Sequence, residues 1–220
     1  MRDIPLNDYA LSHLRDAEWF VEQDRYKLTK MQCANFWEQK EEMLSERYLK
    51  EIIDKRQEHD GFPDAVCGHS FTNNLQFSDP AAVVENYEIG SKIQDFMTNI
   101  CINIGVKRNA LFSVYPPGGF ITWHNNANAP AYNFIFTWSE TGDGWFKFWD
   151  INKQEIVTIP DKKGWQCKAG YFGSYKEPDK LCYHAASTEC LRMTIAFTLS
   201  QGEMSLNWQD DIIEDIRLYK

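Results

Sequence analysis

The sequence predicts an α+β fold in which helices come first and a double-sheet jelly roll follows. The residue patterns of two parts of the chain predict this order. The N-terminal part is polar, with apolar residues returning at helical spacing. From Ala110 onward, short apolar, β-branched and aromatic runs alternate with clusters of Gly, Pro, Asn and Asp. With 220 residues, the chain can build one sizeable core, so we expect a single domain over residues 1–220.

Residues 1–107 are expected to form a helical flank and a connecting loop. The stretch 11–57 is rich in Glu, Lys, Gln and Arg and is typical of two amphipathic helices. Gly, Pro and Asn residues in the stretch 59–80 favour a loop with at most one short strand. A further helix is expected to begin at Ser78-Asp79-Pro80, to bury Tyr87 among other apolar residues and to end at Gly105.

Residues 108–200 are expected to form the jelly-roll core, and residues 201–220 a C-terminal helix. Eight short strands of this kind are typical of two packed sheets with jelly-roll connections. The predicted strands are Leu111–Tyr115, Phe120–His124, Tyr132–Trp138, Trp145–Trp149, Glu155–Ile159, Trp165–Tyr171, Leu181–Ala185 and Leu191–Leu199.

The charge balance disfavours two classes of partner. With 23 Lys and Arg against 32 Asp and Glu, the net charge of −9 repels nucleic-acid phosphates and anionic membrane surfaces. No apolar run has the length of a membrane span or of a signal peptide. Six cysteines without a C-x-x-C pair are typical of reduced thiols, so we expect a cytoplasmic protein. The sequence leaves the oligomeric state open.

Two histidines fall in the predicted strands, His124 at the end of one and His184, 60 residues later, in another. A strand near a barrel mouth can hold an imidazole rigidly enough to bind a metal. Either histidine taken alone would more often be a core or surface residue than a metal ligand. The remaining histidines, His13, His59 and His69, lie outside the predicted barrel and are expected to be structural or exposed.

The residues around these two histidines follow a spacing that resembles the iron(II)/2-oxoglutarate-dependent dioxygenases, and most closely their prolyl-hydroxylase-like branch. In that family a Tyr-x-x-Gly-x5-His-x-Asp stretch carries two metal ligands, a distal His follows, and a later Arg or Lys binds the cosubstrate. The positions that match are Tyr115, Gly118, His124, His184 and Arg192. The resemblance implies a double-stranded β-helix, a cupin-like jelly roll.

The resemblance also implies the roles of the site residues. His124 and His184 would be iron ligands in a facial arrangement that leaves positions open for a 2-oxo acid and for dioxygen. Arg192, with Thr194 on the same face of its strand, would anchor the far carboxylate of 2-oxoglutarate. Tyr115 would contact the same cosubstrate. The competing interpretations are a core tyrosine and an outward, solvated arginine.

The chain departs from the family at Asn126, where the pattern has Asp. An amide oxygen is a weaker, neutral metal donor. Four interpretations stay open: Asn126 ligates the iron, two histidines hold it together with water or an anion, Asp143 or Asp150 supplies the carboxylate, or the site is inactive. A vacant third corner also resembles the halogenases of the superfamily, although Asn is bulkier than their Gly or Ala.

A different metal site is conceivable in the same region. Cys182, His184 and Cys190 offer thiolate and imidazole ligands that would suit zinc, although a second ligand pair is missing. Buried thiols are the ordinary alternative.

The predicted function is an iron(II)- and 2-oxoglutarate-dependent oxygenase that uses dioxygen to hydroxylate a C–H bond of a peptidyl or small-molecule substrate. The alternative is a non-catalytic jelly-roll binding or structural protein with a degenerate metal site. Asn126 favours this alternative, whereas the matching tyrosine, histidines and arginine favour the enzyme.

Overall fold

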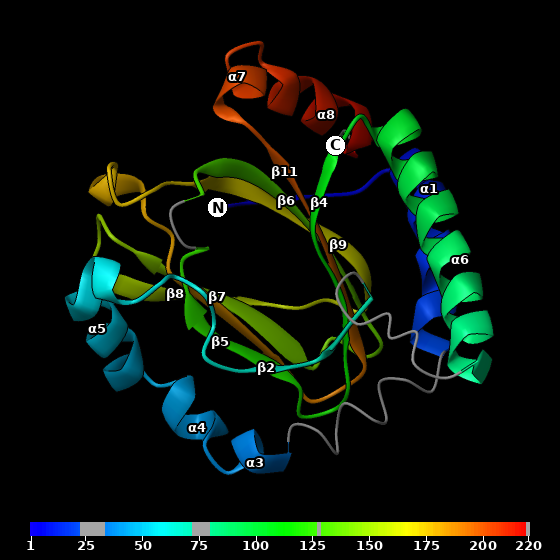
Figure 1. Ribbon diagram of the computed structural model, residues 1–220. Helices are drawn as coiled ribbons and strands as arrows, with labels where there is room; N and C mark the ends of the chain where they lie inside the picture. The colour runs from blue at the N-terminus through cyan, green and yellow to red at the C-terminus, as the bar shows by residue number, and fades with distance from the viewer. Residues whose placement is uncertain (23–33, 72–79, 127–128, 219–220) are drawn as a thin grey trace.

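The computed structural model describes residues 1–22, 34–71, 80–126 and 129–218. Two antiparallel sheets face each other, and helices cover them from outside (Figure 1). The strands are β1 (Arg2–Ile4), β2 (Val66–Cys67), β3 (His69–Ser70), β4 (Arg108–Tyr115), β5 (Phe120–His124), β6 (Ala131–Ser139), β7 (Gly144–Asp150), β8 (Glu155–Pro160), β9 (Gly164–Phe172), β10 (His184–Thr188) and β11 (Arg192–Leu199).

The order of the strands is that of a double-stranded β-helix. One sheet runs β1-β9-β6-β11-β4-β3 and the other β2-β5-β10-β7-β8. Along the chain from β4 to β11, successive strands cross between the two sheets, except for the hairpin β7–β8. This is the jelly-roll arrangement, so the predicted fold class is confirmed.

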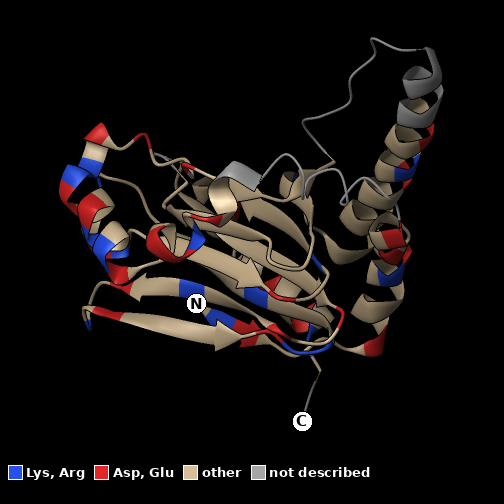
Figure 2. Ribbon diagram, turned by 90° about the horizontal axis from the view of Figure 1, so that it is seen from below, with Lys and Arg blue, Asp and Glu red and all other residues tan. Residues whose placement is uncertain are grey.

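The helices fall into two groups on opposite sides of the barrel (Figure 1). The elements outside the strands are α1 (Asp8–Leu14), η1 (Arg15–Glu22), α3 (Ala34–Trp37), α4 (Lys40–Met43), α5 (Glu46–Lys55), η2 (Arg56–Glu58), α6 (Pro80–Ile104), η3 (Pro178–Lys180), α7 (Gln201–Met204) and α8 (Trp208–Ile216). None of the described helices is long and apolar enough to cross a membrane. Acidic and basic residues are interspersed along α5 and α6 (Figure 2).

Each face of the six-stranded sheet has its own environment. Its outer face, with Phe112, Phe136 and Phe197, packs against Phe20 and Phe96 from the helical elements. Because side chains alternate along a strand, the residues between these point into the barrel. Burial of the outer face fixes the register of each strand, and therefore also fixes which side chains face inward.

Some element boundaries differ from those predicted. The flank expected to hold two helices consists of shorter ones, with α5 starting where the Ser45 side chain accepts from Tyr48 N. The segment 1–107 also supplies the three short strands β1, β2 and β3. The stop at Gly105 is confirmed by its φ of +81°, a conformation that favours glycine. Tyr87 was predicted to be buried and is 79% exposed, because it lies off the face of α6 that packs through Phe96 and Ile100. Ser78 and Asp79 lie outside the described residues.

The boundary that matters most for the site is the start of β10. The apolar run Leu181–Ala185 was predicted as a strand, but the strand is His184–Thr188. Leu181 and Tyr183 instead pack beside α5 in a separate apolar cluster, so burial does not require them to join the sheet. His184 is therefore the first residue of its strand.

Candidate metal and cosubstrate site

The two predicted histidines meet across neighbouring strands. His124 ends β5 and His184 begins β10, and the two are direct partners in the antiparallel ladder. Their ring centroids lie 4.0 Å apart, with 48° between the ring planes. Both residues are buried, with 5% and 7% of their surface exposed. Strand pairing alone thus brings together two imidazoles that are 60 residues apart in the chain.

Main-chain carbonyls orient both rings. Nδ1 of His124 lies 2.8 Å from the carbonyl oxygen of Thr122, and Nδ1 of His184 lies 2.9 Å from that of Cys182. Because a carbonyl oxygen can only accept, Nδ1 carries the proton in each ring. Each Nε2 keeps its lone pair, which is the arrangement found in metal-binding histidines.

Both imidazoles are neutral near pH 7. Burial lowers the pKa of His124 to about 4. Burial, followed by the proximity of His124, lowers the pKa of His184 well below its usual value. A neutral imidazole binds a metal without first releasing a proton, so the pair is ready to act as ligands at physiological pH.

The lowered pKa values predict acid destabilisation of the metal-free protein. Between pH 6.5 and 4 the unfolded chain binds protons that the folded His124 rejects, so stability falls as the pH falls. For His124 the loss reaches about 3 kcal/mol at pH 4. We expect urea unfolding at pH 7 and pH 4.5 to show it, and His124→Gln to have a smaller pH dependence than the surface variant His13→Gln. Equal pH dependence in the two variants would contradict this assignment.

The third corner of the site holds no carboxylate. Asn126 follows His124 by two residues, is half-buried and has a φ of 61° in the left-handed region, which asparagine tolerates better than most residues. Across residues 1–22, 34–71, 80–126 and 129–218, no three His, Cys, Asp or Glu side chains gather as metal ligands. Among the predicted ligand positions, Asn126 is therefore the candidate that follows His124 closely in sequence and offers an oxygen atom to a metal.

The alternative carboxylates are engaged elsewhere. Asp143 Oδ2 accepts a hydrogen bond from the Thr141 hydroxyl at 2.8 Å. Asp150 Oδ1 caps the turn between β7 and β8, where it accepts from Asn152 N and Lys153 N at 3.1 Å each. The hydrogen bonds of both carboxylates therefore go to groups other than the two histidines.

The zinc interpretation is not supported by the thiols. Burial raises the pKa of Cys182 to about 12, which favours the protonated thiol in the metal-free protein. Cys190 Sγ lies 3.2 Å from Ser139 Oγ, in a different hydrogen-bonded group. The described cysteines fit the interpretation as buried or half-buried thiols.

The three predicted cosubstrate residues are neighbours inside the barrel. Arg192 and Thr194 share the inner face of β11, and Arg192 pairs across the ladder with Tyr115 of β4. Arg192 Nη1 donates to Thr194 Oγ1 at 2.5 Å, and its guanidinium carbon lies 5.8 Å from the centre of the Tyr115 ring. All three are buried, so the alternative of an outward, solvated arginine is wrong.

Two charged residues that no motif predicts complete this interior group. Asp161 Oδ2 accepts from Arg192 Nε at 2.8 Å, and Asp161 Oδ1 lies 3.4 Å from Lys168 Nζ. Lys168 Nζ also donates to Gln166 Oε1 at 3.0 Å. Gly144 leaves room for the carboxylate, since a Cβ there would lie 2.6 Å from Asp161 Oδ2. The available sequence signal was Lys168 itself, a lysine between apolar residues in a buried strand.

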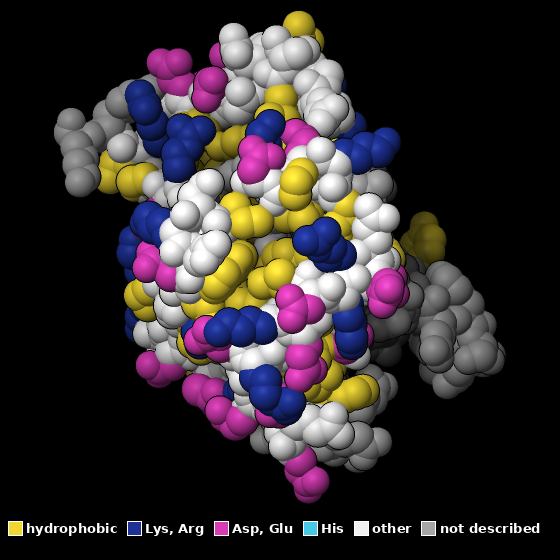
Figure 3. Space-filling view, turned by 90° about the vertical axis from the view of Figure 1, so that its left-hand side faces the viewer, with side chains coloured by type: hydrophobic (Ala, Val, Ile, Leu, Met, Phe, Trp, Pro, Cys, Tyr) yellow, Lys and Arg dark blue, Asp and Glu magenta, His cyan; other side chains and the backbone are white. Residues whose placement is uncertain are grey.

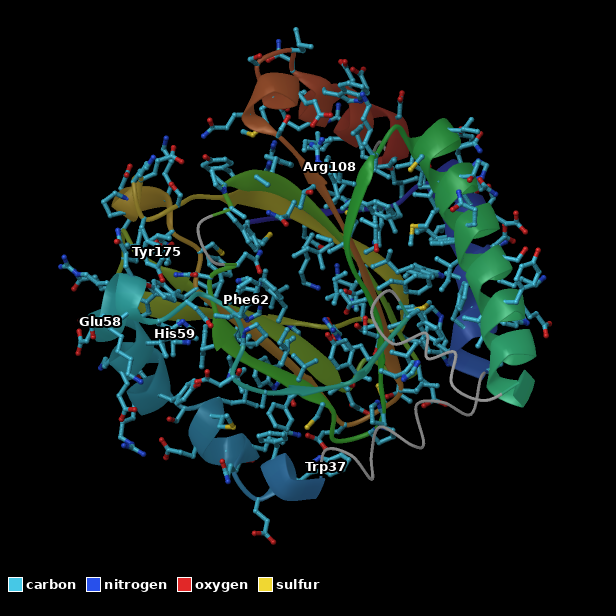
Figure 4. All side chains as sticks on the ribbon, viewed as in Figure 1. Trp37, Glu58, His59, Phe62, Arg108 and Tyr175 are labelled. Carbon is cyan, nitrogen blue, oxygen red and sulfur yellow. The ribbon has the colours of Figure 1, made fainter. Side chains whose placement is uncertain are left out.

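A third histidine, His59, lies beside Tyr175 on the side of the molecule that carries α5 (Figure 4). Tyr175 Oη donates toward the carbonyl oxygens of Arg56 and His59, at 2.8 and 3.0 Å, and accepts from Asn125 Nδ2 at 3.0 Å. His59 is buried, and its Nε2 has no hydrogen-bond partner among the described residues. Its charge, if protonated, would lower the pKa of His124 further. The expectation that His59 is merely structural or exposed therefore overlooked its position near the site.

A cleft of about 710 Å³ lies on this side of the molecule, between α5 with η2 and the segment that leads to His184. Figure 3 shows the side of the molecule on which α5 lies, with an apolar area bordered by charged side chains of both signs. The apolar lining of the cleft comes from Ile53, Ile151, Tyr175, Leu181 and Tyr183.

Comparisons with known proteins give a likeness in fold. No protein-family model matches the chain. No curated protein sequence matches it either. A prolyl hydroxylase from Trichoplax adhaerens, solved with a hypoxia-inducible-factor peptide fragment, is 12% identical over 72% of this chain and 79% of that one, with a TM-score of 0.34. A Pseudomonas putida prolyl-4-hydroxylase is 12% identical over 71% of this chain and 85% of that one, with a TM-score of 0.33.

A viral collagen prolyl hydroxylase from Paramecium bursaria Chlorella virus-1, solved as a 2-oxoglutarate complex, is 11% identical. It matches 71% of this chain and 91% of that one, with a TM-score of 0.32.

Proposed function

We propose that the protein is an iron(II)- and 2-oxoglutarate-dependent oxygenase that hydroxylates a C–H bond of a peptidyl or small-molecule substrate. The observation that carries the proposal is the neutral pair His124 and His184. Main-chain carbonyls accept from both Nδ1 atoms, so the lone pair of each Nε2 can bind a metal. The same barrel encloses a buried cationic group suited to an acidic cosubstrate.

The residues present fit a ferrous ion at two of three corners. His124 and His184 would bind it through Nε2, and Asn126 would add a neutral amide oxygen. When bound with a 2-oxo acid, ferrous iron supplies the activation of dioxygen and the oxidation of the C–H bond. Phe146 and Phe172 lie 5.6 and 4.8 Å from the His184 ring, between centroids, and keep water away from this side of the pair.

The barrel interior would hold the acidic cosubstrate. Arg192, Thr194 and Tyr115 offer a guanidinium and two hydroxyl groups in a buried setting, where charge-assisted hydrogen bonds are strong. A cytosolic location is part of the proposal, because none of the described cysteines forms a disulfide and reduced surroundings keep iron ferrous.

An anaerobic titration tests the proposal. Ferrous iron and 2-oxoglutarate are added to the metal-free protein, and the visible charge-transfer band of the chelate is followed before oxygen is admitted and succinate is measured. We expect a band and succinate from the native protein and from His13→Ala, a control at a half-buried histidine outside the barrel. Absence of both at saturating iron and 2-oxoglutarate would overturn the oxygenase.

A non-catalytic binding protein on the same fold is the second candidate. Asn126, in the place of the carboxylate that the family pattern has, favours it. A binding protein would still take up the 2-oxo acid in the barrel, but it would release no succinate when oxygen is admitted.

Replacing Asn126 with aspartate is expected to tighten ferrous binding at least tenfold, which corresponds to about 1.4 kcal/mol. The reason is that a carboxylate neutralises part of the metal charge, whereas an amide does not. Competition with a ferrous indicator under anaerobic conditions measures the change, and Asn126→Ala is expected to weaken binding. Unchanged affinity in both variants would show that residue 126 is not a ligand.

A further inference from the structure

The barrel interior carries a surplus positive charge. Asp161, Lys168 and Arg192 are the only buried residues among the described Asp, Glu, Lys and Arg. Their side chains are 0%, 1% and 3% exposed. One carboxylate faces two cations, so the group holds a net charge of +1 where water cannot screen it. Such a charge is costly unless an anion joins the group.

The surplus belongs to Lys168 rather than to Arg192. The Asp161 carboxylate lies 2.8 Å from Arg192 Nε but 3.4 Å from Lys168 Nζ. The shortest hydrogen bond of Lys168 goes to the neutral amide oxygen of Gln166, at 3.0 Å. Burial is the largest cause that lowers the pKa of Lys168, as expected for an ammonium group that lacks a full countercharge.

A buried hydroxyl group without a partner lies on the same inner face. Thr137 of β6 pairs directly with Thr194 of β11 on one side and with Gln166 of β9 on the other. Directly opposed residues in antiparallel strands share a face, so these three side chains form a row inside the barrel. Thr137 is completely buried, and its Oγ1 has no hydrogen-bond partner within the part of the chain that the structure describes. An unpartnered buried hydroxyl costs about 1–3 kcal/mol, so a ligand that accepts from it is favoured.

We propose that Lys168 and Thr137 form a carboxylate-binding subsite, and that it takes the far carboxylate of a 2-oxo dicarboxylic acid. One carboxylate supplies the single negative charge that the group lacks and accepts from the Lys168 ammonium and from the Thr137 hydroxyl. Arg192, which Asp161 neutralises and which holds Thr194, then contacts the cosubstrate beside this subsite without supplying the missing charge. The identity of the ligand as the oxygenase cosubstrate rests on the proposed function, whereas the need for a monoanionic group rests on the charges alone.

Calorimetric titration of the metal-free, full-length protein tests this subsite. The two probes are 2-oxoglutarate and 2-oxobutyrate, which keeps the 2-oxo acid end but lacks the far carboxylate. We expect the native protein to bind 2-oxoglutarate at least tenfold more tightly than 2-oxobutyrate. No binding of 2-oxoglutarate, or equal affinity for the two acids, would overturn the subsite.

Variants then locate the subsite. Lys168→Met leaves the Asp161–Arg192 pair balanced, so it is expected to fold, and it should weaken 2-oxoglutarate binding at least tenfold. Thr137→Val keeps the side-chain shape and should weaken binding several-fold. The matched strand controls are Lys147→Met on β7 and Thr158→Val on β8, which should bind as the native protein does. Native affinity in folded Lys168→Met would overturn the proposal.

The same experiments separate this inference from the proposed function. The variant His184→Ala is expected to lose iron but to keep Lys168-dependent binding of 2-oxoglutarate. If binding depends on Lys168 while no succinate forms with iron and oxygen, the subsite stands and the oxygenase fails. Succinate formation that does not depend on Lys168 would contradict the proposed subsite but not the proposed oxygenase activity.

Discussion

Replacing Asp161 with asparagine is expected to lower the free energy of unfolding by about 3–5 kcal/mol. The carboxylate is the one buried negative charge between Arg192 and Lys168, and an amide in its place leaves two cations buried without a counterion. The shape of the side chain is retained, so the loss would be electrostatic rather than a packing defect. Urea unfolding of the metal-free protein at pH 7 measures it.

A double variant provides the control for this effect. Adding Lys168→Met to Asp161→Asn removes one of the two unbalanced cations and should recover at least about 1 kcal/mol. The surface variant Glu155→Gln, also at a β-strand position, should change stability by less than about 0.5 kcal/mol. If Asp161→Asn were as stable as Glu155→Gln, the interior charges would not be coupled as their distances indicate.

Replacing His184 with alanine is expected to weaken ferrous binding by at least about 100-fold and to abolish succinate formation. One of two nitrogen donors is lost, and the remaining imidazole with an amide oxygen cannot offset the cost of partly dehydrating the ion. His124→Ala should have the same effect, because the two rings pair directly across β5 and β10. Anaerobic competition with a ferrous indicator gives the affinities.

The matched control is His13→Ala, which removes a half-buried imidazole of α1, outside the barrel. It should bind iron as the native protein does. Native affinity in His184→Ala would show that this histidine is a packing residue beside Phe172 rather than a ligand. A similar loss in His13→Ala would point to nonspecific binding of iron by surface imidazoles.

Local patterns predicted much of the fold. Short apolar, β-branched and aromatic runs placed the strands of the barrel within a few residues, because helices cover the outer face of the six-stranded sheet and the barrel interior buries its inner face. Gly105 marked the end of α6 because its left-handed φ favours glycine. Tyr87 and the start of β10 were misplaced, since their burial depends on neighbours that are distant in the chain.

The site residues also fall into those that a local sequence pattern predicts and those that depend on distant contacts. His124, His184 and Arg192 stand at a recognisable spacing, and the structure brings the two histidines together. Asp161 and Lys168 have no spacing rule, because their contact depends on how β9 packs behind the turn after β8. A lysine in a strand usually faces solvent, so only the register of β9 reveals that Lys168 points inward.

The carbonyl anchors of the two imidazoles also determine how the site can vary. Thr122 and Cys182 orient the rings through main-chain oxygens, which every residue type possesses. Their side chains can therefore change to fit a different substrate or interior packing without turning either ring. The orientation of the two imidazoles and the choice of substrate therefore depend on different atoms of the chain. The residues that select the substrate can change while the orientation of the imidazoles is kept.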